Sequence, residues 1–343
     1  MKKFRYLLAV IIGVLMLGFF TTNADAANNG MGFTASRVDN PYQTNDSVGY
    51  FDMTVKPGQH TNLKVKLYNL TNQELKIAGS VNTSYTSGNG TESYNQLNPY
   101  SKDLSTEINQ LSSLTGGKQI ITLKPKEEKV VSFPLIMPSK PYKGILEGAI
   151  YLSQLTDTAK QSSRGNLAIH NKFALQLGVV LRENGSVKPD MQLNTISTGI
   201  DQAASFSPAF SANLENTQPA MITNLKIKGQ IKQHNRVLYE TTRSKLGMAP
   251  RSNFNYLVNT KGERLKAGNY QIRIVADANE GHWEFTKNFT ITKEQAEKAN
   301  LHAEKGFNWW WIVLLIIILL LLLWLIIWLK RRKKDEETED DLY

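Results

Sequence analysis

The chain has 343 residues, and its 40 basic and 30 acidic side chains give it a formal net charge of +10. It contains no cysteine, which excludes disulfides and every reaction that needs a thiol nucleophile, such as sortase-like or papain-like chemistry. The positive charge favours association with an anionic polymer such as teichoic acid. Nucleic acid is disfavoured as a partner, because the basic residues are scattered along the chain rather than clustered.

An export signal is predicted for residues 1–26. Lys2, Lys3 and Arg5 form a positive start, an apolar run follows over residues 7–20, and Ala24 and Ala26 supply the small residues of a cleavage site. An uncleaved membrane helix is the alternative, but the apolar run is short for one. An exported animal domain of this size normally carries disulfides, so the absence of cysteine favours a bacterial protein.

A first β-sandwich is predicted for residues 30–155. Apolar and polar residues alternate strictly over residues 51–55, 63–67 and 75–81, which indicates strands with one buried face. Turns rich in glycine, proline and asparagine separate these short strands, as is typical of a sandwich or barrel.

An insertion over residues 82–118 interrupts this rhythm and carries Tyr85, Tyr94 and Tyr100. Long insertions in β domains are often functional, and aromatic faces stack on sugar rings. These tyrosines are therefore the candidate glycan contacts. The alternative is that they pack the insertion onto its own domain.

A second β-sandwich is predicted for residues 167–292, after a polar linker over residues 156–166. Alternation resumes at Phe173, and Asn184-Gly185 is a strong hairpin signal because both residues tolerate positive φ. Together the two segments predict an all-β fold of two tandem immunoglobulin-like sandwiches.

The C-terminal part predicts a short helical stalk over residues 293–308, a transmembrane helix over 309–329 and a cytoplasmic tail over 330–343. The apolar run is long enough to cross a bilayer as a helix, and aromatic and basic residues flank it. The protein is therefore expected to be a single-pass type I membrane protein with its ectodomain in the cell wall or outside it. The residues expected to form the anchor are Trp309, Trp310, Trp311, Trp324, Trp328, Lys330, Arg331, Arg332, Lys333 and Lys334.

The enzyme signatures that can be recognised by motif are absent. There is no Gly-x-Ser-x-Gly elbow, no His-Glu-x-x-His zinc motif and no phosphate-binding loop. Gly30–Ala35 formally matches a dinucleotide fingerprint, but no strand is predicted before it. We therefore predict no cofactor, no metal site and no catalytic residue.

In the order of its parts and in several short stretches, the chain resembles the WxL-interacting proteins of Gram-positive bacteria. The stretches that carry the resemblance are Gly49–Phe51, Val55–Gln59, Val65–Thr71, Gly144–Ile150, Gly178–Arg182 and Leu265–Tyr270. The resemblance implies a first domain that binds peptidoglycan, a second domain that binds a host protein, and association with WxL-domain surface proteins. The chain has no Trp-x-Leu sequence, so it resembles the partner of a WxL protein rather than a WxL protein itself.

The expected function is that of a membrane-anchored, non-enzymatic adaptor at the cell surface. It would bind peptidoglycan or teichoic acid, dock WxL-domain proteins and contribute to attachment to a host extracellular-matrix protein. Two sandwiches end to end span on the order of 80 Å, which a thick wall can bury, so wall and WxL-protein binding rank above host binding.

Two alternatives to the adaptor remain open. One is a wall-modifying enzyme whose first candidate carboxylates are Asp103, Glu107, Glu127 and Glu128. The other is an extracytoplasmic chaperone that donates or accepts strands.

Overall fold

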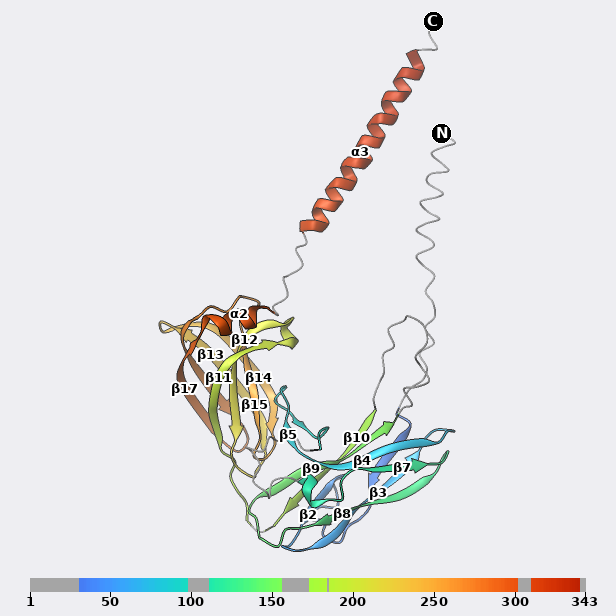
Figure 1. The fold of residues 1–343 in the computed structure, drawn as a ribbon, viewed down its shortest axis with the longest axis vertical. Coiled ribbons are helices and arrows are strands. Elements are labelled where there is room, and N and C mark those ends of the chain that lie inside the picture. Colours follow the sequence, from blue (N-terminus) through green and yellow to red (C-terminus); the bar gives the residue numbers. More distant parts are fainter. Residues whose placement is uncertain (1–30, 98–110, 156–172, 184, 302–309, 340–343) are drawn as a thin grey trace. The chain divides into compact units, whose positions relative to one another are not determined.

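The computed structural model describes residues 31–97, 111–155, 173–183, 185–301 and 310–339 (Figure 1). The predicted signal peptide, its cleavage site at Ala24 and Ala26, the linker over 156–166 and Tyr100 lie outside these residues. The chain divides into two compact units. Unit 1 comprises Met1–Met191, Glu215–Thr223 and Leu246–Asn253, and unit 2 comprises Gln192–Leu214, Asn224–Lys245 and Phe254–Tyr343.

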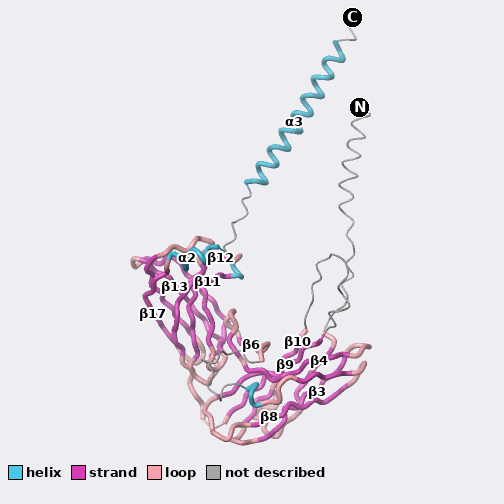
Figure 2. The backbone as a smooth tube through the Cα atoms, in the orientation of Figure 1, coloured by secondary structure: helices cyan, strands magenta, loops and turns pink. Residues whose placement is uncertain are grey.

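Unit 1 is built from two main β-sheets and a short hairpin, and strands dominate it (Figure 2). The three-stranded sheet has the order β1-β3-β8, with β1 Phe33–Arg37, β3 His60–Asn69 and β8 Glu128–Ile136. The five-stranded sheet has the order β2-β10-β9-β4-β7, with β2 Phe51–Thr54, β10 Ala174–Arg182, β9 Ile145–Leu155, β4 Leu75–Thr83 and β7 Gln119–Leu123. The hairpin consists of β5 Tyr85–Thr86 and β6 Glu92–Ser93, and a 3₁₀ helix η1 follows at Leu111–Leu114.

The hydrophobic core of unit 1 draws side chains from both main sheets. In β3 the apolar residues Leu63, Val65 and Leu67 are fully buried, while the lysines between them face solvent. This is the period of two that places alternate side chains on opposite faces of a sheet. The packing is tight at Gly79, because a Cβ there would approach the ring of Phe133 to 2.9 Å.

One pairing in unit 1 joins strands that lie far apart in the sequence. β10 runs parallel to β2, with Val179 opposite Phe51 and Arg182 opposite Thr54. The Arg182 guanidinium binds Asp52 across this pair, at 2.9 Å between Nη2 and Oδ1. β10 lies within the range 167–292 that the sequence assigns to the second sandwich, yet it pairs on both sides with strands of unit 1.

Two further sheets make up most of unit 2, although some residues at the ends of their strands, such as Leu246–Met248, belong to unit 1. The first has the order β11-β12-β15, with β11 Met191–Asp201, β12 Ser207–Asn216 and β15 Asn253–Asn259. The second has the order β14-β13-β16-β17, with β14 Arg236–Met248, β13 Ile222–Gln233, β16 Gly268–Asp277 and β17 His282–Ile291. The buried Tyr256 of β15 ties the two sheets together, because its hydroxyl lies 3.0 Å from the Ile227 carbonyl and 2.7 Å from that of Thr241.

Two buried asparagines hold the turns that follow β3 and β12 in the same way. The Asn69 amide donates to the carbonyls of Gln73 and Lys124, and its oxygen accepts from the backbone N–H of Thr71. Asn216 donates to the carbonyls of Ala220 and Ala249 and accepts from the N–H of Gln218. Each side chain thereby satisfies backbone groups that would otherwise be buried without partners.

The helix α2 (Lys293–Leu301) covers the first part of the predicted stalk. Thr292 and Gln295 form a reciprocal capping box at its start: the Thr292 N–H donates to Gln295 Oε1 at 2.9 Å, and the Gln295 N–H donates to Thr292 Oγ1 at 3.2 Å. The helix packs on unit 2, since Asn300 is buried and bonds both the N–H and the carbonyl of Leu265. Residues 302–308 lie outside the described chain.

The second helix, α3 (Trp310–Glu339), contains most of the predicted membrane anchor. In the part of the chain that the structure describes, no helix combines the length and the apolar character needed to cross a bilayer. A crossing helix needs about 20 apolar residues in succession. The absence of such a helix contradicts the predicted transmembrane helix over 309–329. It also contradicts the predicted localisation as a single-pass type I membrane protein.

The predicted anchor residues fall into three groups. Trp324 and Trp328 are exposed on α3, and Trp309 lies outside the described residues. The other predicted anchor residues lie within the helix α3: Trp310, Trp311, Lys330, Arg331, Arg332, Lys333 and Lys334.

Candidate functional site

The predicted insertion begins as a short hairpin in unit 1. Tyr85 of β5 pairs with Ser93 of β6, and the tip closes with a bond of 2.8 Å from the Ser87 N–H to the Thr91 carbonyl. Gly90 in this turn has φ of 68°, a left-handed conformation that glycine adopts without strain.

The base of the hairpin rests on a buried cluster of two carboxylates and a tyrosine. The Tyr94 hydroxyl lies 2.9 Å from Glu147 Oε1 and 3.3 Å from Glu92 Oε2. Glu147 comes from β9 and is only 6% exposed, and its Oε2 has no hydrogen-bond partner among the described residues. Two carboxylates so close together in a buried site favour a form in which they share a proton.

Burial controls the protonation of this cluster. Burial, followed by the charge of Glu92, raises the pKa of Glu147 to about 8. Burial also raises the pKa of Glu92, and burial together with both carboxylates raises the pKa of the Tyr94 hydroxyl. The cluster therefore holds a proton at neutral pH.

A second segment of unit 1 fixes the other side of the hairpin. The Gly90 carbonyl accepts from the N–H of Gly247 at 2.9 Å, and Thr86 Oγ1 accepts from the N–H of Ala249 at 3.1 Å. The hydroxyls of Thr86 and Ser252 also bond each other, and both residues are buried. The hairpin is therefore a fixed element of unit 1.

The predicted glycan contacts have different environments. Tyr85 is partly exposed, and its hydroxyl lies 2.5 Å from Asn95 Oδ1 and accepts from Gln96 Nε2 at 3.1 Å. The Tyr94 hydroxyl instead points into the carboxylate cluster, so this tyrosine ties the insertion to its own domain. Tyr100 lies outside the described residues.

Glu127 and Glu128, the two suspected carboxylates that lie in the described part of the chain, do not form a paired acid–base site. Glu127 caps a turn by accepting from the Lys124 N–H at 2.6 Å, and Glu128 forms an exposed ion pair with Lys66. Asp103 and Glu107 lie outside the described residues. The pair that the structure does bring together, Glu92 and Glu147, was missed in the sequence, although a lone carboxylate within the apolar strand Ile145–Leu155 is a visible signal.

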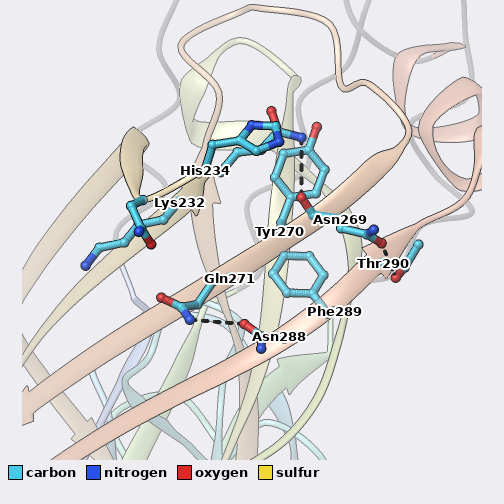
Figure 3. A pocket seen from close by; sticks show the side chains of 10 residues that line it. Lys232, His234, Asn269, Tyr270, Gln271, Asn288, Phe289 and Thr290 are labelled. Atoms are coloured by element: carbon cyan, nitrogen blue, oxygen red, sulfur yellow. Dashed lines mark hydrogen bonds between the residues drawn. The ribbon is translucent and has the colours of Figure 1, made fainter.

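Unit 2 contains a pocket of about 500 Å³ beside the turn between β13 and β14 (Figure 3). Three strands contribute to it: the end of β13, the start of β16 and the end of β17. The residues that line it are Lys232, Gln233, His234, Asn235, Asn269, Tyr270, Gln271, Asn288, Phe289 and Thr290. His234 and Asn235 both have positive φ, as a two-residue hairpin turn requires.

Two protein-family models match consecutive parts of the chain. Residues 33–154 match the model described as WxL Interacting Protein, peptidoglycan binding domain. Residues 164–301 match the model described as WxL Interacting Protein, host binding domain.

Comparison with solved structures gives only remote likenesses. The YadV chaperone has 12% identity and a TM-score of 0.29, over 76% of this chain and 100% of that chain. The E. coli chaperone DraB has 10% identity and a TM-score of 0.26, over 69% and 92%. A CsuC–CsuE complex of Acinetobacter baumannii has 10% identity and a TM-score of 0.31, over 68% and 93%. No curated protein sequence matches the chain.

Proposed function

The chain belongs to the WxL-interacting protein family, and from this premise we propose that it is a non-enzymatic cell-surface adaptor that also docks WxL-domain proteins. Its first domain binds peptidoglycan and its second domain binds a host protein. The observation that carries the proposal is the succession of the two family matches, over 33–154 and 164–301. Both matched models are described as binding domains, which supports a binding role rather than catalysis.

The hairpin of unit 1 is the proposed glycan contact within the first domain. Tyr85 supplies a partly exposed ring, and Asn95 and Gln96 hold its hydroxyl in place. A ring fixed in this way can stack on a sugar without losing further rotamer freedom. The neighbouring amides are suited to hydrogen bonding with hydroxyl and acetamido groups of the glycan.

Sedimentation of the purified full-length chain with cell-wall sacculi tests this proposal. We expect the chain to sediment with the sacculi, and Tyr85→Ala to bind roughly three- to tenfold more weakly because one aromatic contact is lost. Tyr42→Ala is the matched control, since Tyr42 is an exposed tyrosine of unit 1 that is not part of the hairpin. A chain that stays in the supernatant at low salt overturns peptidoglycan binding, and equal binding by the two variants overturns the assignment to Tyr85.

A further inference from the structure

The hairpin of unit 1 consists of a first arm, a tip and a second arm, which comprise Tyr85–Thr86, Ser87–Thr91 and Glu92–Gln96. The first arm and the tip are held by hydrogen bonds between uncharged groups, which join them to residues 246–253. The second arm is held at Tyr94, whose hydroxyl lies in the carboxylate cluster. Only the second arm is therefore fixed through groups that titrate.

The second arm also orients the proposed glycan contact. Asn95 and Gln96 bond the Tyr85 hydroxyl at 2.5 and 3.1 Å. Tyr94 directly precedes these two residues, and its hydroxyl lies 2.9 Å from Glu147 Oε1. A displacement of Tyr94 therefore also displaces the groups that hold the ring of Tyr85.

One hydroxyl proton serves two carboxyl groups in the cluster. The Tyr94 hydroxyl lies 2.9 Å from Glu147 Oε1 and 3.3 Å from Glu92 Oε2, and it can donate to only one of them. Glu147 is 6% exposed, and its Oε2 has no partner among the described residues. A second negative charge in this site would be buried without compensation, so the closed arrangement needs one neutral carboxyl.

The strongest influences on the two carboxyl groups come from within the cluster. After burial, the pKa of Glu147 depends mainly on Glu92 and Tyr94. The Ser84 hydroxyl adds a further hydrogen bond to Glu147. After burial, the pKa of Glu92 depends on Tyr94 and Glu147.

Two neighbouring elements carry an arginine, and neither neutralises the cluster. On β10, which pairs with β9, Arg182 is bound to Asp52 at 2.9 Å between Nη2 and Oδ1. The segment 246–253 carries Arg251, which is not among the main influences on the pKa of either carboxyl group. A second charge in the cluster therefore meets the first without a cation between them.

We propose that the proton held by Glu92 and Glu147 is a latch for the second arm of the hairpin. With the proton in place, Tyr94 closes on β9 and the second arm orients Tyr85. Without it, the two buried charges repel each other and the second arm separates from β9, while the first arm and the tip stay in place. The latch thereby regulates the glycan contact, and this consequence rests on the proposed function.

One uncharged bond to the second arm does not depend on the proton. Asn82 Nδ2 donates to the Tyr94 carbonyl at 2.7 Å. A single neutral hydrogen bond contributes little net stability, because water replaces it when it breaks. The repulsion between two buried carboxylates outweighs it.

The direction of the pH dependence follows from the two states of the second arm. In the closed state burial, followed by the charge of Glu92, raises the pKa of Glu147 to about 8. Release of the arm uncovers the carboxyl group, so its pKa returns toward 4.5, the value of an exposed glutamate. The closed state therefore loses stability as the pH rises from about 4.5 toward 8.

Spin labels test the latch directly, because the chain has no cysteine of its own. Leu97→Cys places one label next to the second arm, and Lys64→Cys places the other on β3, and both positions are exposed. Double electron–electron resonance on the full-length chain measures the distance between the labels. We expect this distance to change, and its distribution to broaden, between pH 6 and pH 9.

A second label pair is the matched control for the first. Gly88→Cys combined with Lys64→Cys reports on the tip of the hairpin, where a Cβ on Gly88 meets no atom within 4 Å. We expect its distance to stay the same between pH 6 and pH 9, because uncharged groups hold the tip.

Two substitutions are expected to keep the second arm closed at pH 9. Glu147→Gln removes one charge and keeps an oxygen that accepts from Tyr94. Glu92→Gln removes the other charge at a partly exposed position, which makes it the milder change for folding. Glu74→Gln, at an exposed position of the same unit, should respond to pH as the wild type does.

Sedimentation with sacculi at the same two pH values measures the consequence for binding. We expect the wild type to bind about tenfold more weakly at pH 9 than at pH 6, and Glu147→Gln to lose much less. The comparison of the two chains at equal pH removes the effect of pH on the sacculi themselves.

Each contrary result overturns a defined part of the inference. An unchanged distance from Leu97 in the wild type, or an equal change in both glutamine variants, overturns the latch. A change of the same size at Gly88 also overturns it, because the whole hairpin would then have moved. If the second arm moves but wild-type binding falls no more than that of Glu147→Gln, regulation of the glycan contact is overturned. A chain that sediments at neither pH overturns the proposed glycan contact instead, and the label distances still decide the latch.

Discussion

At the scale of single residues, Glu147 is the most unusual side chain in the described part of unit 1. It is a carboxylate in the middle of a buried strand, with one oxygen bound to Tyr94 and the other without a partner among the described residues. Burial of a charge is costly unless it is paired, so the group keeps its proton instead.

The free energy of unfolding therefore depends on pH through Glu147. Its pKa in the folded chain is about 8, against 4.5 for an exposed glutamate. Below about pH 4.5 both the folded and the unfolded chain hold the proton, and the contribution of this group to stability is fully present. As the pH rises toward 8 the unfolded chain releases the proton first, and that contribution is lost.

Glu147→Gln is expected to flatten this pH dependence. The amide keeps an oxygen that accepts from Tyr94 but has no proton to lose, so the variant should be more stable than the wild type at pH 8, by on the order of 1–3 kcal/mol. Urea unfolding at pH 5, 6.5 and 8 measures the effect. Glu74→Gln, at an exposed position, serves as control. Parallel pH profiles for the wild type and Glu147→Gln would contradict the prediction.

The sequence could identify some of the site residues but not their partners. Tyr85 and Tyr94 stand out as aromatic residues in a polar insertion, and Tyr85 remains the candidate glycan contact. The partner of Tyr94 is Glu147, which lies 53 residues further along the chain in β9. A local sequence pattern cannot reveal a contact between residues that far apart. The acid–base suspects Glu127 and Glu128 are adjacent in the chain, but their side chains serve a turn and an ion pair instead.

At the scale of elements, the edge strands of unit 1 carry exposed apolar side chains. Ile120 of β7 is 57% exposed, and Val130 and Ile136 of β8 are 54% and 52% exposed. Both strands lie at the end of their sheets, and an exposed edge can accept a further strand. We propose these edges as the docking site for WxL-domain proteins.

Ile120→Asp combined with Val130→Asp tests the proposed docking. A charge on each edge strand disfavours strand addition, so capture of a WxL-domain protein by the full-length chain should fall by about tenfold or more. Leu70→Asp is the control, because Leu70 is exposed in a loop of the same unit. Unchanged capture by the double variant, measured by surface plasmon resonance, would place the docking site elsewhere.

Local pattern predicts strands better than it predicts their partners. The alternation of Leu63, Val65 and Leu67 predicts both β3 and its buried face. The parallel pairing of β10 with β2 is invisible in the sequence, because a strand of alternating residues fits any sheet with a free edge. The apolar run over 309–329 predicted a membrane helix by composition alone, and the described part of the chain does not support it.

At the scale of the whole molecule, the excess of positive charge bears on how the chain meets the cell wall. A formal net charge of +10 attracts an anionic polymer over distances that salt shortens to about 10 Å at 0.1 M. Aromatic stacking on a glycan depends little on salt. The two contributions can therefore be separated by experiment.

Binding to sacculi that retain teichoic acid should weaken as sodium chloride rises from 50 to 500 mM. Binding to sacculi stripped of teichoic acid should change little over the same range, because only the glycan contact remains. Sedimentation at each concentration measures both curves. Identical salt dependence for the two preparations would show that the charge of the chain does not act through teichoic acid.

Family membership is the level at which sequence and comparison agree most fully. The short stretches that carry the resemblance, such as Gly144–Ile150 and Gly178–Arg182, lie in β9 and β10 or just before them. They form the central strands of one sheet, which explains why they are recognisable. The proposed glycan contact is not recognisable in this way, because a partly exposed residue such as Tyr85 obeys no packing pattern.

The parallel pairing of β10 with β2 also sets the order in which the protein can be made. Phe51 leaves the ribosome early, but its neighbour Val179 follows only 128 positions later. The sheet of unit 1 therefore lacks one of its strands until residues 174–182 have been synthesised. A recombinant fragment that stops at residue 155 would lack that strand, whereas one extended to residue 190 would include it.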